Sequence, residues 1–200
     1  MIFSRFFTHK ALLGAVLLCS ANSAFANNIT ATQQQFFQNL TALCGKAFVG
    51  TVVKGNASDD KMRSQPLLMH VRECSDTEIK VPFHVGEDRS RTWVISKTDT
   101  GLRLKHDHRH KDGSADKVTM YGGDTTTTGT AELQLFPADQ YSKNMFIANK
   151  MAVSNGNTWL LEIQPGKIYR YGLKREGREF MVEFDLTKAV TAPPAPWGHK

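Results

Sequence analysis

The sequence predicts an all-β protein, an antiparallel up-and-down barrel or sandwich of about 8–10 strands with one N-terminal helix. Apolar residues alternate with polar ones in short runs over most of the chain, as they do in half-buried strands. Turn-forming Gly, Pro, Asn or Asp residues separate these runs at intervals of roughly ten residues. Apolar residues at helical spacing stand out only near the N-terminus.

The first 26 residues have the three-part plan of a cleavable secretory signal. Arg5 and Lys10 provide positive charge, an apolar run follows at 11–19, and Ala24-Phe25-Ala26 forms a small-residue cleavage site. The apolar run is too short to span a bilayer. We therefore expect residues 1–26 to be a signal peptide and the mature chain to be periplasmic or secreted by a bacterium.

Lipoprotein processing at Cys19 is the alternative to simple cleavage, although Leu18 is not the small residue that it requires. No later stretch is apolar over the ~20 residues of a membrane-spanning helix. Signal removal leaves 23 basic and 19 acidic side chains, a formal charge of +4. Because the basic residues are scattered among acids, nucleic acid is not an expected partner.

Two cysteines remain after signal removal, Cys44 and Cys74. An even pair in an oxidising compartment indicates a disulfide bond, which would stabilise the fold by roughly 3–4 kcal/mol. A metal-binding or catalytic thiol is the alternative.

The mature chain has the length of one domain with a real core, which we place at 27–190. Residues 191–200 form a proline-rich tail that we expect to be extended or disordered. We find no internal repeat.

The expected helix covers residues 32–43, where Phe36, Phe37, Leu40 and Leu43 fall at helical spacing before Gly45. The clearest strand follows much later, at 180–186, where four apolar residues alternate with Met181, Glu183 and Asp185. The same alternation predicts strands at 169–173, 159–163 and 79–85. Further strands are expected at 46–54, 67–74, 91–97, 101–110, 117–122 and 130–136.

A helix running into Gly45-Lys46-Ala47-Phe48-Val49-Gly50-Thr51 and a following series of up-and-down strands resembles the layout of lipocalin-like proteins, the calycins. In that family a Gly-x-Trp motif occupies this position, and an arginine near the last strands packs over its tryptophan. The resemblance implies that Phe48 takes the aromatic place, with Arg175 or Arg178 as the arginine. The whole chain also resembles small secreted proteins common in proteobacteria, a likeness that implies no activity.

The most unusual segment is a run of alternating histidines before Asp112-Gly113, a hairpin signal. His106, His108 and His110 share one strand face with Leu102 and Leu104 because side chains alternate. A two-residue loop would set the histidines beside Lys117, Thr119 and Tyr121. We favour a three-residue loop, which sets them beside Asp116, Val118 and Met120 and keeps the apolar residues on one face.

The histidines permit three interpretations. His106 and His108 suit a shared zinc or copper ion, with His110 or Asp116 completing the site. A histidine at a barrel mouth also suits a haem or a polar ligand head. Otherwise these are hydrated hairpin residues balanced by Asp107 and Asp116.

Catalytic motifs are lacking. Neither Gly-x-Ser-x-Gly nor His-Glu-x-x-His occurs. Ser58 and Lys61 match Ser-x-x-Lys but lie in a polar loop, where chance accounts for the match. The Gly122-Gly123 pair does not lead into a helix, so a phosphate cradle is not expected there.

These observations favour a binding protein over a catalyst, one that holds a small apolar or amphipathic ligand inside the barrel. The candidate ligand-binding residues are His106, His108, Tyr121, Trp93 and Trp159. The first alternative is a metal-binding protein or metalloenzyme that uses the histidines. The second is an envelope interaction module whose barrel is filled by aromatic side chains. The sequence leaves the cofactor, the ligand's identity and the oligomeric state open.

Overall fold

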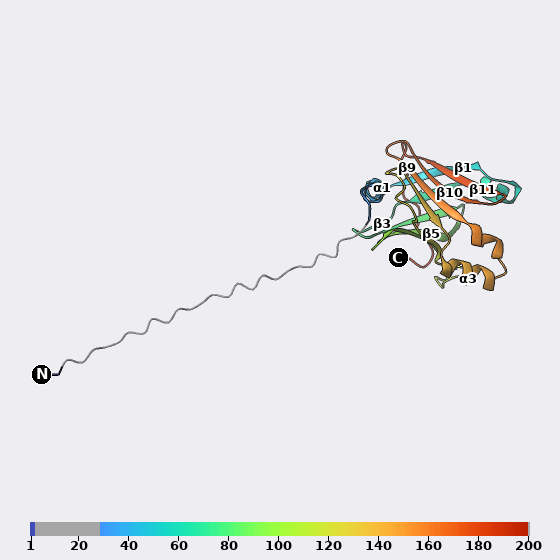
Figure 1. The fold of residues 1–200 in the computed structure, drawn as a ribbon. Helices are drawn as coiled ribbons and strands as arrows, with labels where there is room; N and C mark the ends of the chain where they lie inside the picture. The colour runs from blue at the N-terminus through green and yellow to red at the C-terminus, as the bar shows by residue number, and fades with distance from the viewer. Residues whose placement is uncertain (3–28, 200) are drawn as a thin grey trace.

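A computed structural model describes residues 1–2 and 29–199 of the chain (Figure 1). The expected signal peptide, 1–26, lies outside the described residues apart from Met1 and Ile2. The helices and strands from residue 29 onward form a single barrel-shaped body with α1 and α3 on opposite sides of it (Figure 1).

The elements follow one another in a strand-rich order, with two 3-10 helices labelled η. They are α1 (Ala31–Thr41), β1 (Ala47–Lys54), η1 (Ala57–Asp59), α2 (Asp60–Arg63), β2 (Leu67–His70), β3 (Glu73–Cys74), β4 (Glu78–Val85), β5 (Asp88–Thr98), β6 (Gly101–His108), β7 (Tyr121–Asp124), β8 (Leu133–Pro137), α3 (Gln140–Ala148), η2 (Ala152–Gly156), β9 (Thr158–Gln164), β10 (Ile168–Arg175) and β11 (Arg178–Asp185).

The strands form one antiparallel sheet in the order β7-β6-β5-β4-β2-β1-β11-β10-β9-β8, with β3 paired to β4 at its side. Neighbours in this order are consecutive main strands in the chain, except that the last strand returns to the first, with Gly50 opposite Phe184. The predicted antiparallel up-and-down barrel is therefore confirmed.

A seam between β7 and β8 nearly closes the barrel. The amide of Asp139 donates to the carbonyl oxygen of Gly122 at 2.9 Å. The hydroxyl of Ser142 accepts from the Gly122 amide at 2.8 Å and donates to its carbonyl at 2.9 Å. A Cβ at Gly123 would collide with the carbonyl oxygen of Pro137, so only glycine permits this approach. The Gly-Gly pair is thus a closing element of the barrel.

The core lies inside the barrel and under α1. The inward residues of the last three strands are buried as their alternation predicted: Trp159, Leu161, Ile163, Tyr169, Tyr171, Phe180, Val182 and Phe184. Helix α1 begins with a capping box between Thr30 and Gln33 and buries Phe36, Phe37 and Leu40 against this core. The N-terminal helix is therefore confirmed.

The disulfide between Cys44 and Cys74 is present, with a Cα–Cα distance of 6.3 Å. It ties the segment after α1 to β3. No helix within the described ranges is long and apolar enough to cross a bilayer.

One helix was expected, whereas the described residues contain three, of which α2 is a single short turn. Helix α3 begins because Asp139 accepts a hydrogen bond from the Ser142 amide at 2.8 Å, and it buries Phe146. Strong strand patterns on both sides and a short apolar face hide this helix in the sequence.

The favoured register, with His106 beside Met120, is wrong, whereas the two-residue-loop alternative is borne out where His106 meets Tyr121. The return strand begins only at Tyr121, which lies opposite His106. Between the two strands, the Asp116 amide donates to the His108 carbonyl at 2.9 Å, and Met120 adopts a positive φ of 55°. Residues 116–120 thus follow an irregular path that no simple two- or three-residue turn describes.

The proline-rich tail has no helix or strand, yet it packs on the barrel. The amide of Trp197 donates to the carbonyl of Arg89 at 3.0 Å, and the Arg89 side chain donates to the Ala195 carbonyl at 3.1 Å. The sequence had favoured an extended or disordered tail. These contacts hold this part of the tail against β5.

Candidate ligand-binding cavity

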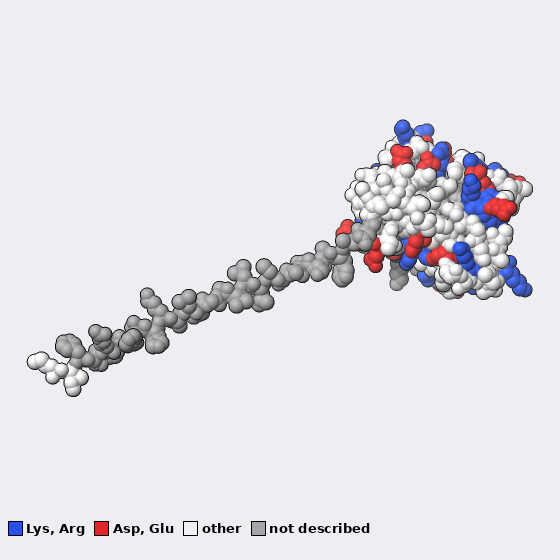
Figure 2. All heavy atoms as spheres, in the orientation of Figure 1, with Lys and Arg blue, Asp and Glu red and all other residues white. Residues whose placement is uncertain are grey.

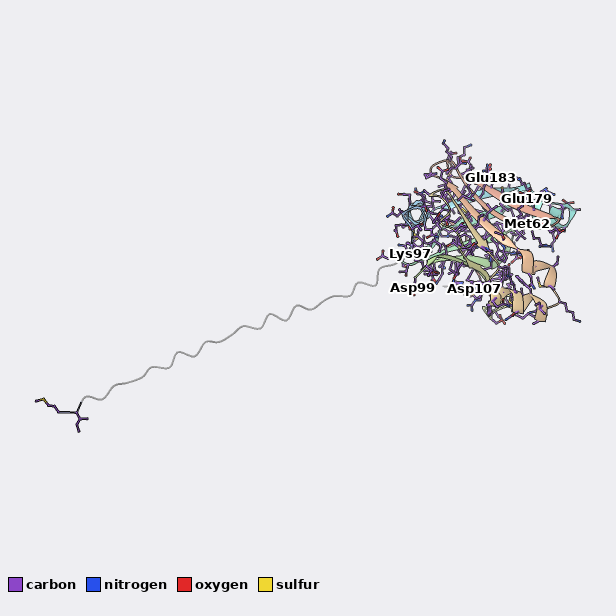
Figure 3. The ribbon with its side chains drawn as sticks, viewed as in Figure 1. Met62, Lys97, Asp99, Asp107, Glu179 and Glu183 are labelled. Atoms are coloured by element: carbon purple, nitrogen blue, oxygen red, sulfur yellow. A yellow bond between two sulfur atoms is a disulfide. The ribbon has the colours of Figure 1, made fainter. Side chains whose placement is uncertain are left out.

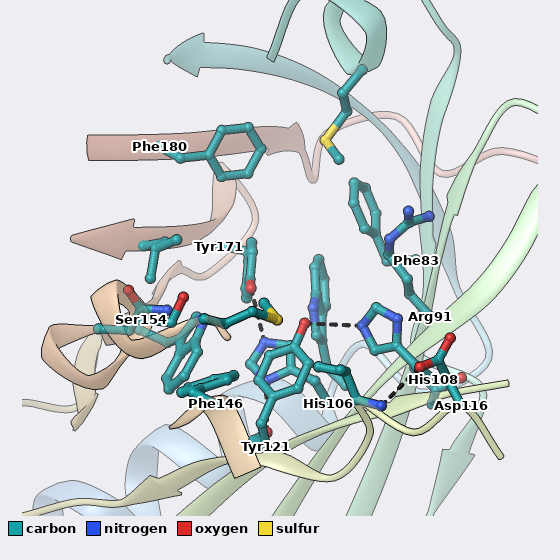
Figure 4. A pocket seen from close by; sticks show the side chains of 18 of the residues that line it. Phe83, Arg91, His106, His108, Asp116, Tyr121, Phe146, Ser154, Tyr171 and Phe180 are labelled. Carbon is teal, nitrogen blue, oxygen red and sulfur yellow. Dashed lines mark hydrogen bonds between the residues drawn. The ribbon is translucent and has the colours of Figure 1, made fainter. Parts of the chain in front are cut away.

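A cavity of about 380 Å3 opens at the end of the barrel beside α2, α3 and η2 (Figure 4). Figure 3 labels Met62 of α2 at this end and Lys97 and Asp99 at the other. The lining comes from strands of both halves of the barrel and from α2, α3 and η2: Asp59, Met62, Phe83, Arg91, Thr92, Trp93, His106, His108, Asp116, Val118, Tyr121, Phe146, Met151, Ser154, Asn157, Trp159, Tyr171, Leu173, Arg178 and Phe180.

Stacked rings form the wall of the cavity. Trp93 lies between Phe83 and Tyr171, with ring centroids 4.9 and 4.3 Å away and both pairs stacked. Tyr121 stacks on His106 at 4.6 Å. Because each ring is fixed by a neighbour, this wall offers a rigid apolar surface whose flat faces suit other flat or aliphatic groups.

His106 is almost fully buried and both of its ring nitrogens are engaged. Nδ1 lies 3.0 Å from the backbone oxygen of Tyr121, and Nε2 lies 2.8 Å from the hydroxyl of Tyr171. A carbonyl only accepts, so the proton resides on Nδ1 and Nε2 accepts from Tyr171. Burial lowers the pKa of His106 from 6.5 to about 3, which keeps the ring neutral.

His108 makes a second histidine–tyrosine pair nearer the mouth. Its Nε2 lies 3.0 Å from the hydroxyl of Tyr121 (Figure 4). Burial and the neighbouring Arg91 guanidinium lower the pKa of His108 from 6.5 to about 4, and burial raises the pKa of Tyr121 to about 12. All four groups of the two pairs are therefore uncharged near neutral pH.

Three of the four charged residues of the lining are in ion pairs. Arg178 holds Asp59 through two hydrogen bonds of 2.5 and 2.6 Å, which fasten η1 and α2 to β11. Arg91 donates to Asp88 at 2.6 Å. Asp116, the remaining acid of the lining, accepts from the Val118 amide at 2.8 Å. A neutral, aromatic interior thus lies under a rim whose two arginines are balanced by acids.

The structure brings all five predicted ligand-binding residues into this one cavity: Trp93, His106, His108, Tyr121 and Trp159. Of the four predicted metal ligands, it gathers only His106, His108 and Asp116 there. The His110 side chain is 57% exposed and lies 3.9 Å from Asp116.

Within the described part of the chain no three His, Cys, Asp or Glu side chains are arranged to hold a metal ion. The nitrogens of His106 are already taken by Tyr121 and Tyr171, so this ring could coordinate a metal only by giving up a buried hydrogen bond. These contacts disfavour the metal interpretation.

Sequence reasoning missed the contribution of residues 146–157. Phe146, Met151, Ser154 and Asn157 line the cavity from α3, η2 and the loop after them. Their spacing follows neither a strand nor a long helix, so no periodic signal pointed to them. Asp139 before α3 and Asn155-Gly156-Asn157 after it are local turn signals, but they do not assign the segment to a cavity.

No protein family, curated protein or solved structure matches the chain. The likeness to lipocalins therefore rests on layout. Arg178 pairs with Asp59 and lies over Phe180, and Arg175 donates to Asn157 at 3.1 Å. Both candidate arginines are thus engaged at the cavity end, whereas Phe48 is buried in the core.

Proposed function

We propose that the protein binds a small amphipathic molecule inside the barrel, with the apolar part of that molecule against the aromatic wall. The observation that carries the proposal is the cavity of about 380 Å3, enclosed by stacked rings and a few convergent polar groups. Small-molecule sites have volumes of roughly 300–1,000 Å3 and this mixture of lining groups.

The chemistry of the lining disfavours an anionic ligand. The two histidines are neutral, and the two arginines have acidic partners, so a negatively charged group would lack a counter-charge in the interior. Tyr121 and Tyr171 offer hydroxyl groups, and Ser154 and Asn157 add further polar side chains at the η2 side. We therefore propose a flat or aliphatic body carrying one or two hydroxyl, carbonyl or amide groups.

Binding rather than catalysis is proposed because the polar groups of the lining satisfy one another. A general base needs a pKa near the working pH, and burial removes His106 and His108 from that range. The Cys44–Cys74 disulfide supports a periplasmic or secreted location, since such bonds persist in oxidising compartments.

A fluorescence titration tests the proposal. The probe is N-phenyl-1-naphthylamine, an uncharged aromatic molecule whose emission rises in an apolar site. We expect saturable binding to the mature wild-type protein. Val118→Trp, which places a large ring in the cavity, should abolish that binding.

Val49→Trp is the matched control, because Val49 is 51% exposed on β1 and does not line the cavity. It should bind the probe like the wild type. Equal binding by both variants, or no binding by the wild type, would refute a cavity site and favour a filled-core interaction module.

A further inference from the structure

The rim of the cavity carries an exposed apolar patch, formed by Ile147, Met151 and Val153 at the end of α3 and in η2. Their side chains are 58%, 37% and 68% exposed. By comparison, Val49 and Val53 of β1 are exposed apolar residues on the outer face of the barrel. Several apolar side chains gathered at the opening of a cavity indicate an interaction surface rather than ordinary surface scatter.

The patch is continuous with the cavity. Met151 both exposes part of its side chain and lines the cavity. Phe146, the residue before Ile147, lies in the cavity wall, and its carbonyl accepts from the Met151 amide at 2.7 Å. A molecule that leaves the cavity past η2 therefore meets the patch first.

The segment that carries the patch is positively charged. Between Asp139 and Glu162 the sequence contains Lys143 and Lys150 and no acidic residue. Lys143 lies one helical turn before Ile147 on the same face of α3. The surface over α3 is largely white in Figure 2, with blue side chains of Lys or Arg and some red acidic side chains at its border.

We infer that this patch docks the protein on an anionic lipid bilayer. Apolar side chains flanked by lysines are the combination that holds proteins at a bilayer interface, where the apolar groups enter the headgroup region and the lysines meet lipid phosphates. Docking here would set the cavity mouth against the membrane. The inference goes beyond the proposed function and does not require that the cavity hold a ligand.

Vesicle co-sedimentation tests the docking. Mature protein is mixed with vesicles of phosphatidylglycerol and phosphatidylcholine, and with vesicles of phosphatidylcholine alone. We expect binding to the anionic vesicles that weakens with added salt. Ile147→Asp/Val153→Asp should lower the vesicle affinity at least about tenfold, and Lys143→Glu/Lys150→Glu should lower it by at least about fivefold per lysine.

Val49→Asp is the matched control, since Val49 is 51% exposed on β1, away from the patch. It should bind vesicles like the wild type. Near-UV circular dichroism of the buried aromatic cluster checks that each variant folds. If Ile147→Asp/Val153→Asp does not fold, Ile147→Ser/Val153→Ser takes its place. Probe binding in the cavity should persist in every patch variant, which separates this inference from the proposed function.

Three results would overturn the inference. The first is no binding of the wild type to anionic vesicles. The second is equal binding by the patch variants and the wild type. The third is a concentration-dependent dimer, in analytical ultracentrifugation, that the patch substitutions abolish, since that would assign the patch to a second copy of the chain.

Discussion

The hydroxyl of Tyr171 donates to Nε2 of His106 across 2.8 Å inside the barrel. The two side chains come from β10 and β6, on opposite halves of the sheet, so this bond joins the walls of the cavity. With the Nδ1 proton directed at the Tyr121 carbonyl, the imidazole is left neutral and fixed in orientation. The bottom of the cavity is therefore a preformed surface.

Tyr171→Phe should destabilise the protein by about 1–3 kcal/mol, because it leaves Nε2 of His106 buried without a partner. Tyr169→Phe provides the comparison two residues away on the same strand. The Tyr169 hydroxyl is buried and has no hydrogen-bond partner among the described residues, so its loss should be neutral or stabilising. Urea denaturation measures the free energy of unfolding of both variants. Equal losses would contradict the hydrogen bond between Tyr171 and His106.

Stability should decrease as the pH falls below about 6.5. His106 has a folded-state pKa of about 3, below its ordinary 6.5, so the unfolded chain takes up a proton first. The contribution of neutral His106 to the free energy of unfolding is complete above pH 6.5 and falls by about 1.4 kcal/mol per pH unit toward pH 3. When the pH is lowered from about 7.5 to about 5, the free energy of unfolding of His106→Gln should fall by about 2 kcal/mol less than that of the wild type. Identical pH dependence in the two proteins would show that His106 is not held neutral.

Gly123→Ala should open the seam between β7 and β8, because its methyl group would collide with the Pro137 carbonyl. We expect a loss of at least about 2 kcal/mol, since the obstacle is backbone. Gly156→Ala is the control, as its nearest neighbour would lie at 3.8 Å. Thermal unfolding compares the two, and a wild-type melting temperature for Gly123→Ala would mean that the strands are not held together there.

Replacing both disulfide cysteines, as Cys44→Ser/Cys74→Ser, should cost roughly 3–4 kcal/mol. The bond spans 30 positions, and its loss frees the unfolded chain more than it disturbs the barrel. The variant should therefore keep the near-UV circular dichroism spectrum of the wild type but unfold at a lower urea concentration. A variant that is as stable as the wild type would argue against the bond.

The sequence was most informative where one face of a strand is buried. Trp159, Leu161 and Ile163 alternate because each points into the barrel, so the strand, its inward face and its core residues were all readable. His106 and Trp93 were assigned to the cavity by the same alternation, and their cross-strand pairing places them side by side.

The parts that could not be predicted depend on contacts between distant segments. The choice of the register that sets Tyr121 opposite His106 depends on an irregular loop and on the close approach of Gly123 to Pro137, which no local pattern encodes. The position of Met151 depends on how α3 packs against β7. The wall of the cavity was thus predictable from strand alternation, whereas its rim was not.

The most direct test of whether the barrel holds a small molecule is native mass spectrometry. The protein is purified without detergent from the cells that express it. If the barrel holds a small molecule, the wild type should carry one additional mass of a few hundred units, and Val118→Trp, with its cavity filled, should not. The same added mass on both proteins would place the molecule outside the cavity. The bare chain alone in both spectra would contradict a barrel that retains its ligand.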